Sequence, residues 1–193
     1  MDRASFITHE AFEGEISDVL IPRERIVSRL DELAAEIAAC YAGKELTALA
    51  VMTGAMVFLS DLIRRLPLRV RLDVVRASSY PSRAQRSESV SVIGPVAFDL
   101  AGRDVLIVDD ILDSGKTLRA IASCAAGARA ASVRTCVLLR KRRDDLAERP
   151  RADFVGFDID DHFVVGYGLD HDNLYRNLPD ICLLRGPGGG QRA

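Results

Sequence analysis

Hydrophobic residues in the first third of the chain follow two patterns: a helical spacing and a nearly contiguous apolar run. Residues 46–52 are apolar except for Thr47, a pattern that is typical of a buried strand. A helix is predicted after this strand, over residues 55–66. An amphipathic helix is predicted over residues 22–41, where the apolar side chains lie three or four positions apart: Ile26, Leu30, Leu33, Ile37 and Ala38.

The rest of the chain continues this alternation of apolar strands and helices. Strands are predicted at residues 70–79, 105–108 and 132–139 and from 163 onward, with a further helix at 118–128. Alternating strands and helices predict an α/β fold with a largely parallel sheet.

Length and composition narrow the possibilities without naming a function. At 193 residues, we expect one domain over residues 1–185, followed by a glycine-rich, disordered tail at 186–193. The net charge of −2 does not indicate binding to nucleic acid or to a membrane surface. The chain lacks an apolar run of membrane-spanning length and an N-terminal signal core, so we expect a cytoplasmic protein.

The cysteines and histidines argue against a zinc site. The three histidines are scattered, and no two cysteines form a C-x-x-C pair. We expect reduced thiols at the four cysteines, Cys40, Cys124, Cys136 and Cys182.

Candidate chemistry concentrates directly after the apolar run at 105–108. Three carboxylates, Asp109, Asp110 and Asp113, precede a Ser-Gly-Lys-Thr turn that opens a helix. The carboxyl end of a buried strand is where open α/β sheets bind ligands, and the following helix N-terminus favours a phosphate. A phosphorylated sugar, with hydroxyls or a metal near the acids and its phosphate near the amides, satisfies both features.

This stretch also resembles two other kinds of structure, a P-loop and a helix cap. An ATP-binding P-loop requires glycine at position 110, where Asp110 stands, so that motif is excluded. A solvated acidic turn that caps the helix is the plainer alternative. The combination of three acids, an apolar strand and the Ser-Gly-Lys-Thr turn favours a binding site over the cap.

The string VDDILDSGKT resembles the signature of the type I phosphoribosyltransferases, which bind 5-phosphoribosyl-1-diphosphate (PRPP). The resemblance implies a mostly parallel sheet flanked by helices, with a small hood formed by the N- and C-terminal segments. It also implies that Asp109 and Asp110 hold the ribose hydroxyls and that Asp113 is the candidate general base. The 5′-phosphate would lie on Asp113, Ser114, Gly115, Lys116 and Thr117.

Two further loops resemble parts of the hypoxanthine-guanine branch of that family. Thr53-Gly54 follows a buried strand and corresponds to the diphosphate-binding loop, with threonine where lysine is usual. Backbone amides there can still bind diphosphate. Ser79-Tyr80 corresponds to the start of a lid that keeps water from the reacting ribose, although the polar segment after it is also compatible with a plain hairpin tip.

Lys141 directly follows the strand predicted at 132–139. In hypoxanthine-guanine enzymes, a lysine at this place reads the 6-oxo group of the purine. Counting from Asp109 selects Lys141, whereas counting back from Asp153-Phe154 selects Arg142, and we prefer Lys141. A solvated basic turn is the alternative.

The string FVVGYGLDHDNLYRNLPDI, residues 163–181, resembles the same branch nearly residue for residue. By this match Phe163 stacks on the purine and Val164 meets its edge through the backbone. Asp170 belongs with these purine-side residues and would also help to hold Mg²⁺, together with Asp109 and Asp110. Arg176 would contact the diphosphate.

These matches predict a purine salvage enzyme that transfers phosphoribosyl from PRPP to N9 of hypoxanthine or guanine with Mg²⁺ as cofactor. A xanthine-preferring enzyme and a PRPP- or nucleotide-sensing regulator with weak catalysis are the alternatives. The resemblance implies a homodimer or homotetramer, and we expect neither nucleic acid nor membrane as a partner.

Overall fold

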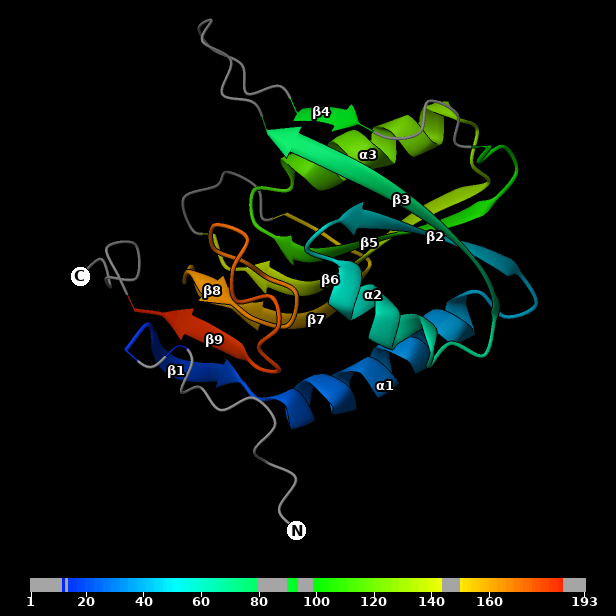
Figure 1. The fold of residues 1–193 in the computed structure, drawn as a ribbon. Coiled ribbons are helices and arrows are strands. Elements are labelled where there is room, and N and C mark those ends of the chain that lie inside the picture. The colour runs from blue at the N-terminus through cyan, green and yellow to red at the C-terminus, as the bar shows by residue number, and fades with distance from the viewer. Residues whose placement is uncertain (1–11, 13, 80–89, 94–98, 144–149, 186–193) are drawn as a thin grey trace, which may run out of the picture.

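The computed structural model describes residues 12, 14–79, 90–93, 99–143 and 150–185 (Figure 1). Its main feature is a six-stranded sheet with the strand order β4-β3-β2-β5-β6-β7. Five neighbouring strands run parallel, and β4 alone pairs antiparallel, with β3. The strands are β2 (Glu45–Met52), β3 (Arg69–Ser79), β4 (Val90–Ile93), β5 (Asp104–Leu112), β6 (Ser132–Lys141) and β7 (Phe154–Ile159).

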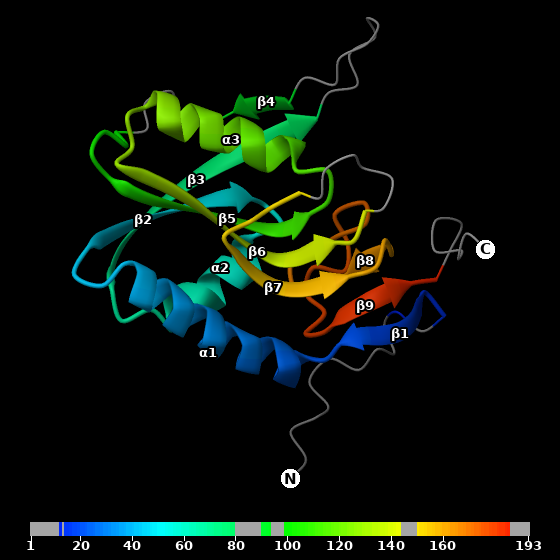
Figure 2. The same cartoon turned by 180° about the vertical axis from the view of Figure 1, so that it is seen from behind.

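Helices cover both faces of this sheet, as the two opposite views show (Figures 1 and 2). Helices α1 (Arg23–Cys40) and α2 (Met56–Ile63) cover one face, and α3 (Lys116–Gly127) covers the other. Alternate residues of the central strand β5 enter the two cores: Leu106 and Val108 pack on the α1/α2 side, and Val105 and Ile107 on the α3 side. Burial on both faces explains why this strand has no polar alternation.

The predicted elements are present, with shifted ends. The first helix begins at Arg23, with Pro22 in extended conformation at its N-cap, and the helix predicted at 55–66 is shorter, Met56–Ile63. Strand β5 continues to Leu112 because Asp109, Ile111 and Leu112 still pair with β6. The two adjacent aspartates therefore belong to the strand itself and not to a turn after it.

The N- and C-terminal segments form a second sheet of three antiparallel strands, with the order β1-β9-β8. These strands are β1 (Ile16–Ile21), β8 (Val164–Val165) and β9 (Ile181–Leu184). In both views this small sheet lies beside the carboxyl ends of the parallel strands. The expected parallel core with a hood from both terminal segments is thus confirmed.

Two hydrogen bonds attach the hood to the core. The Tyr167 hydroxyl donates to Asp61 of α2 over 2.7 Å, and the backbone N–H of Arg23, at the start of α1, donates to Asp180 over 2.7 Å. These contacts hold the hood against the helices of one face of the sheet.

Two expectations from the sequence, the disordered tail and the single domain, are not tested by the structure. The predicted tail at 186–193 lies outside the described residues, and the division into one domain stays a prediction. Within the described part of the chain, no helix combines the length and apolar character needed to cross a bilayer.

Candidate active site

Four parallel strands place the predicted site residues at one edge of the sheet. The loops after β2, β5 and β7 carry Thr53-Gly54, Asp113 with the Ser-Gly-Lys-Thr turn, and Phe163, and Lys141 is the last residue of β6. Because parallel strands end on the same side, residues far apart in the sequence meet there. This edge is the candidate active site.

At its centre lies the carboxylate pair of Asp109 and Asp110. Asp109 is only 7% exposed, and one of its oxygens accepts the N–H of Asp110 at 3.0 Å. Asp110 in turn accepts the N–H of Ile111 at 2.8 Å. Burial raises the pKa of the Asp109 carboxyl well above its ordinary value, and the neighbouring Asp110 charge adds to this rise. Burial also raises the pKa of Asp110.

Two glycines allow backbone to approach this pair closely. A Cβ added to Gly54 would lie 1.8 Å from Oδ2 of Asp110, and one added to Gly168 would lie 2.6 Å from the carbonyl oxygen of Gly54. Gly168 also has a φ of +99°, which disfavours any side chain. The predicted diphosphate loop, the ribose-binding acid and the hood thus meet at atomic contact, and glycine is required at both positions.

Arg176 and Asp170 form an ion pair beside this contact. Their charged groups are 2.7 Å apart, and Arg176 also donates to the Gly168 carbonyl at 2.6 Å. Asp170 accepts the N–H of Asn173 at 2.9 Å. The charge of Arg176 opposes the rise in the pKa of Asp110, so it is felt at the buried acids. The predicted diphosphate ligand and the predicted Mg²⁺ ligand are therefore direct partners.

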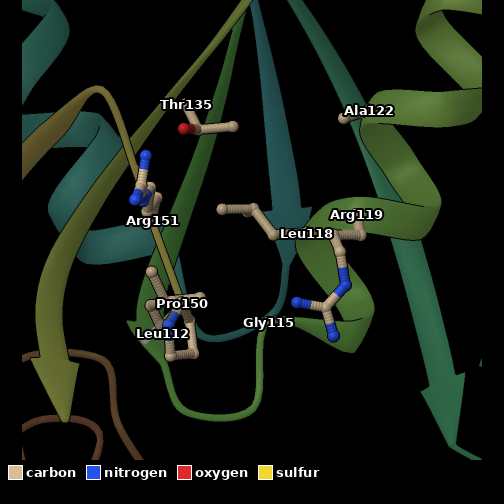
Figure 3. A pocket seen from close by; sticks show the side chains of 8 residues that line it. All are labelled: Leu112, Gly115, Leu118, Arg119, Ala122, Thr135, Pro150 and Arg151. Atoms are coloured by element: carbon tan, nitrogen blue, oxygen red, sulfur yellow. The ribbon is translucent and has the colours of Figure 1, made fainter. Parts of the chain in front are cut away.

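The predicted phosphate loop turns at Gly115, whose φ is +73°, into the N-terminus of α3. Behind the loop, between α3 and β6, lies a cavity of about 300 Å³ (Figure 3). Arg119 lies on its wall and donates to the carbonyl of Ser114 at 3.1 Å, so it supports the loop from behind. The cavity is lined by Leu112, Gly115, Leu118, Arg119, Ala122, Thr135, Pro150 and Arg151.

The residues predicted to meet the base lie at the end of β6 and at the start of β8. Phe163 is exposed and makes an edge contact with His171, the two ring centroids being 5.1 Å apart. Val164 is buried in β8. Lys141, at the end of β6, pairs with Asp161 at 2.8 Å.

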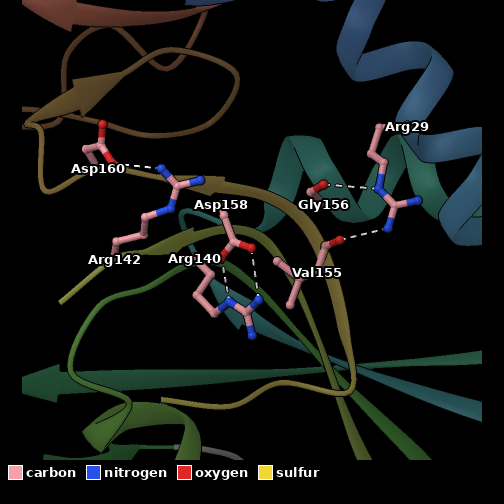
Figure 4. Close-up of polar contacts among 7 residues, drawn as sticks. All are labelled: Arg29, Arg140, Arg142, Val155, Gly156, Asp158 and Asp160. Atoms are coloured by element: carbon pink, nitrogen blue, oxygen red, sulfur yellow. Dashed lines mark hydrogen bonds and ion pairs between the residues drawn. The ribbon is translucent and has the colours of Figure 1, made fainter. Parts of the chain in front are cut away.

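Arg142, the alternative to Lys141, pairs with Asp160 at 2.9 Å (Figure 4). The same figure shows how the strands below these loops are held. Arg140 of β6 makes two hydrogen bonds, of 2.7 and 3.0 Å, to its register partner Asp158 on β7. Arg29 of α1 donates to the carbonyls of Val155 and Gly156.

Sequence reasoning missed three residues here: Arg119, Arg143 and Asp161. Arg143 pairs with Asp113, the candidate general base, and lies near Asp161. The basic run at 140–143 and the acidic residues at 158–161 are visible in the sequence, but only the parallel pairing of β6 with β7 shows which charges meet.

The remaining predicted residues are placed only in part. Ser79 is the last residue of β3, and Tyr80 with the predicted lid lies outside the described residues. Among the residues that the structure describes, no three His, Cys, Asp or Glu side chains are arranged to hold a metal ion. The predicted Mg²⁺ ligands Asp109, Asp110 and Asp170 therefore do not form a site made by the protein alone.

Comparison with known proteins identifies the class. Residues 20–172 match the family model of the phosphoribosyl transferase domain. Hypoxanthine-guanine phosphoribosyltransferase from Mycobacterium avium is 40% identical over 181 residues, which cover 91% of this chain and 89% of the relative. The enzyme of the same name from Bacillus subtilis is 38% identical over 174 residues, covering 89% and 94%.

The solved structures agree with the sequence comparison. A hypoxanthine phosphoribosyltransferase from Staphylococcus aureus superposes with a TM-score of 0.83 at 34% identity, covering 91% of this chain and 95% of that one. The chain belongs to the hypoxanthine-guanine phosphoribosyltransferase family. It is an enzyme of the transferase class, as its sequence predicted.

The contact between Gly54 and Asp110 yields a first prediction. Gly54→Ala should force Asp110 to move or the loop to shift, at a cost of roughly 1–3 kcal/mol. We expect the KM for PRPP to rise by about tenfold or more, measured by steady-state kinetics. The control is Gly127→Ala, since a Cβ at Gly127 meets nothing within 4 Å. An unchanged KM for PRPP in Gly54→Ala would contradict the role of this contact.

The buried acid pair yields a second prediction, about stability and pH. An aspartate ionises near pH 3.8 in an unfolded chain, so with a raised pKa the native state binds more protons above that pH. The free energy of unfolding therefore falls as the pH rises toward the native pKa. Asp109→Asn removes this loss and keeps an oxygen to accept the N–H of Asp110.

We expect the Tm of ligand-free Asp109→Asn at about pH 8 to exceed that of the wild type by a few degrees, on the order of 1 kcal/mol. The difference should narrow toward about pH 4, where both forms are uncharged at this position. Asp18→Asn, at an exposed position of β1, is the control and should leave Tm unchanged. A lower Tm for Asp109→Asn at about pH 8 would show that the buried charge is stabilised, not strained.

Proposed function

We propose that this enzyme transfers the 5-phosphoribosyl group of PRPP to N9 of hypoxanthine and guanine, giving the nucleotide and diphosphate. One observation carries the proposal: beside the buried Asp109, the half-buried Asp110 lies against Gly54 and near the charge of Arg176, at the carboxyl ends of the parallel strands. Carboxylates suit the ribose hydroxyls, while the backbone amides and the arginine suit the phosphates on either side of them.

The two phosphate groups of PRPP then occupy separate loops. The 5′-phosphate lies at the N-terminus of α3, where Gly115 allows the turn and Arg119 supports it. The diphosphate lies between the Thr53-Gly54 loop and Arg176, whose guanidinium stabilises the charge that develops as the bond at C1′ breaks. Backbone amides serve at position 53 in place of the usual lysine side chain.

The same acids fit a magnesium ion bound together with the diphosphate. Carboxylate oxygens are the ligands that Mg²⁺ prefers, and Mg²⁺ sites in such enzymes take one or two carboxylates plus substrate phosphates. Asp170 and one member of the Asp109–Asp110 pair are the residues that would hold it. When bound, Mg²⁺ stabilises the negative charge of the departing diphosphate.

The purine lies between Phe163 and the loop after β6. The exposed Phe163 ring offers a face for stacking, and the backbone of Val164 meets the edge of the base. Lys141 donates to the 6-oxo group, and Asp113 accepts or shares the N7 proton as N9 attacks C1′. The amino group of adenine would place a donor against the lysine donor, which disfavours that base.

We also propose that the enzyme works as a homodimer or homotetramer. Leu72 and Val74 support this, because both apolar side chains are exposed on one face of β3, two positions apart. Sedimentation equilibrium of Val74→Glu should show a shift toward monomer relative to the wild type. An unchanged mass would exclude this face from the interface.

One assay tests the proposed activity directly. The purified enzyme, with PRPP and Mg²⁺, receives hypoxanthine, guanine, xanthine or adenine separately, and nucleotide formation is followed. We expect turnover with hypoxanthine and guanine and none with adenine. Turnover with xanthine alone would assign a different base. Binding of PRPP without turnover of any base would identify a sensor, and Thr53→Lys would then be the first variant to test for restored activity.

A further inference from the structure

Four side chains of alternating charge connect the candidate general base with the lysine proposed to read the purine. Arg143 pairs with Asp113, and its Nε lies 3.9 Å from an oxygen of Asp161. Asp161 pairs with Nζ of Lys141 at 2.8 Å. The chain of charges thus runs from the loop after β5, through the end of β6, to the loop after β7, and it crosses the place proposed for the base.

The covered cations distinguish this network from an ordinary surface ion pair, while its carboxylates stay open to solvent, Asp161 at 55% and Asp113 at 45% exposure. The side chains of its two cations are largely covered: Lys141 is 13% exposed and Arg143 is 20% exposed. Arg142, between them in sequence, is 55% exposed and pairs outside the network with Asp160. Exposed pairs of that kind contribute little, whereas covered side chains that share partners hold one arrangement more firmly.

We propose that Arg143 and Asp161 are positioning residues that set the separation between Asp113 and Lys141 before the base arrives. This inference rests on the proposed function, in which one oxopurine meets both groups at once through its N7 and 6-oxo positions. Prepositioned partners lower the cost of reaching the reactive arrangement. A carboxylate has several lone-pair sites, so Asp113 can pair with Arg143 and still accept the purine proton.

The two positioning residues each pair with a different substrate-facing group, Asp161 with Lys141 and Arg143 with Asp113, so their loss should give different kinetic signatures. Loss of Asp161 releases the Lys141 ammonium, so the KM for hypoxanthine should rise while the KM for PRPP stays the same. Loss of Arg143 releases Asp113, so kcat should fall while the KM for PRPP again stays the same. A merely structural role would affect both substrates and the Tm together.

The decisive experiment is a double-mutant cycle in the full chain, with both KM values and Tm measured for each variant. Asp161→Asn alone should raise the KM for hypoxanthine on the order of tenfold. In a Lys141→Ala background the same substitution should have no further effect, because the side chain it positions is already gone. Arg143→Met should lower kcat, and Arg143→Lys should recover part of it.

Asp99→Asn is the matched control for Asp161→Asn. It removes the carboxylate of an Asp–Arg ion pair of 3.0 Å, formed with Arg103 near the opposite end of β5, and it should change neither KM. The inference is overturned if Asp161→Asn changes the two KM values equally or adds fully to the effect of Lys141→Ala. Turnover by the wild type distinguishes failure of the proposed function from failure of this inference. If the wild type forms no nucleotide from any base, both fail. If the wild type turns over normally and Asp161→Asn has no effect, the inference alone is overturned.

Discussion

The position of two adjacent carboxylates at the end of β5, Asp109 buried and Asp110 half-buried, is the constraint on which the rest of the site depends. Asp109 and Asp110 lie on the strand that forms the centre of the sheet, so they cannot move away from each other or reach water freely. Their raised pKa values record that cost. An apolar pair of the same size would be cheaper for folding, and this cost is consistent with the ribose-binding role proposed for the two acids.

Glycine permits the surrounding backbone to close on these acids. Gly54 lets its loop contact Asp110, and Gly168 lets the hood segment contact Gly54 in turn. Arg176 places its charge beside these contacts. The hood is therefore part of the site and not only a cover for the core. Its attachment through Tyr167 to α2 keeps the Arg176 segment in place against the sheet.

On the side proposed for the base, ion pairs hold the side chains in place, whereas glycines allow close backbone contacts on the side proposed for the diphosphate. Lys141 ends β6, Arg143 follows it, and Asp161 follows the neighbouring strand β7. Their ion pairs restrict long side chains that would otherwise sample many rotamers. Such restriction suits an enzyme that must meet a flat, rigid base at several points of its edge. Ion pairs in one half of the site and close glycine contacts in the other thus both restrict the groups that surround it.

The sequence by itself determined the α/β class, the helices and the buried strands, because apolar periodicity is a local property. It also indicated the acids at 109, 110 and 113, because a motif of contiguous residues can be recognised without knowledge of the fold. The extension of β5 through both aspartates, the strands β1, β7 and β9 and the network through Arg143 were decided only by tertiary structure. Pairing between distant segments sets strand ends and charge partners: Arg143 and Asp161 are eighteen positions apart, and only the alignment of β6 with β7 brings them together.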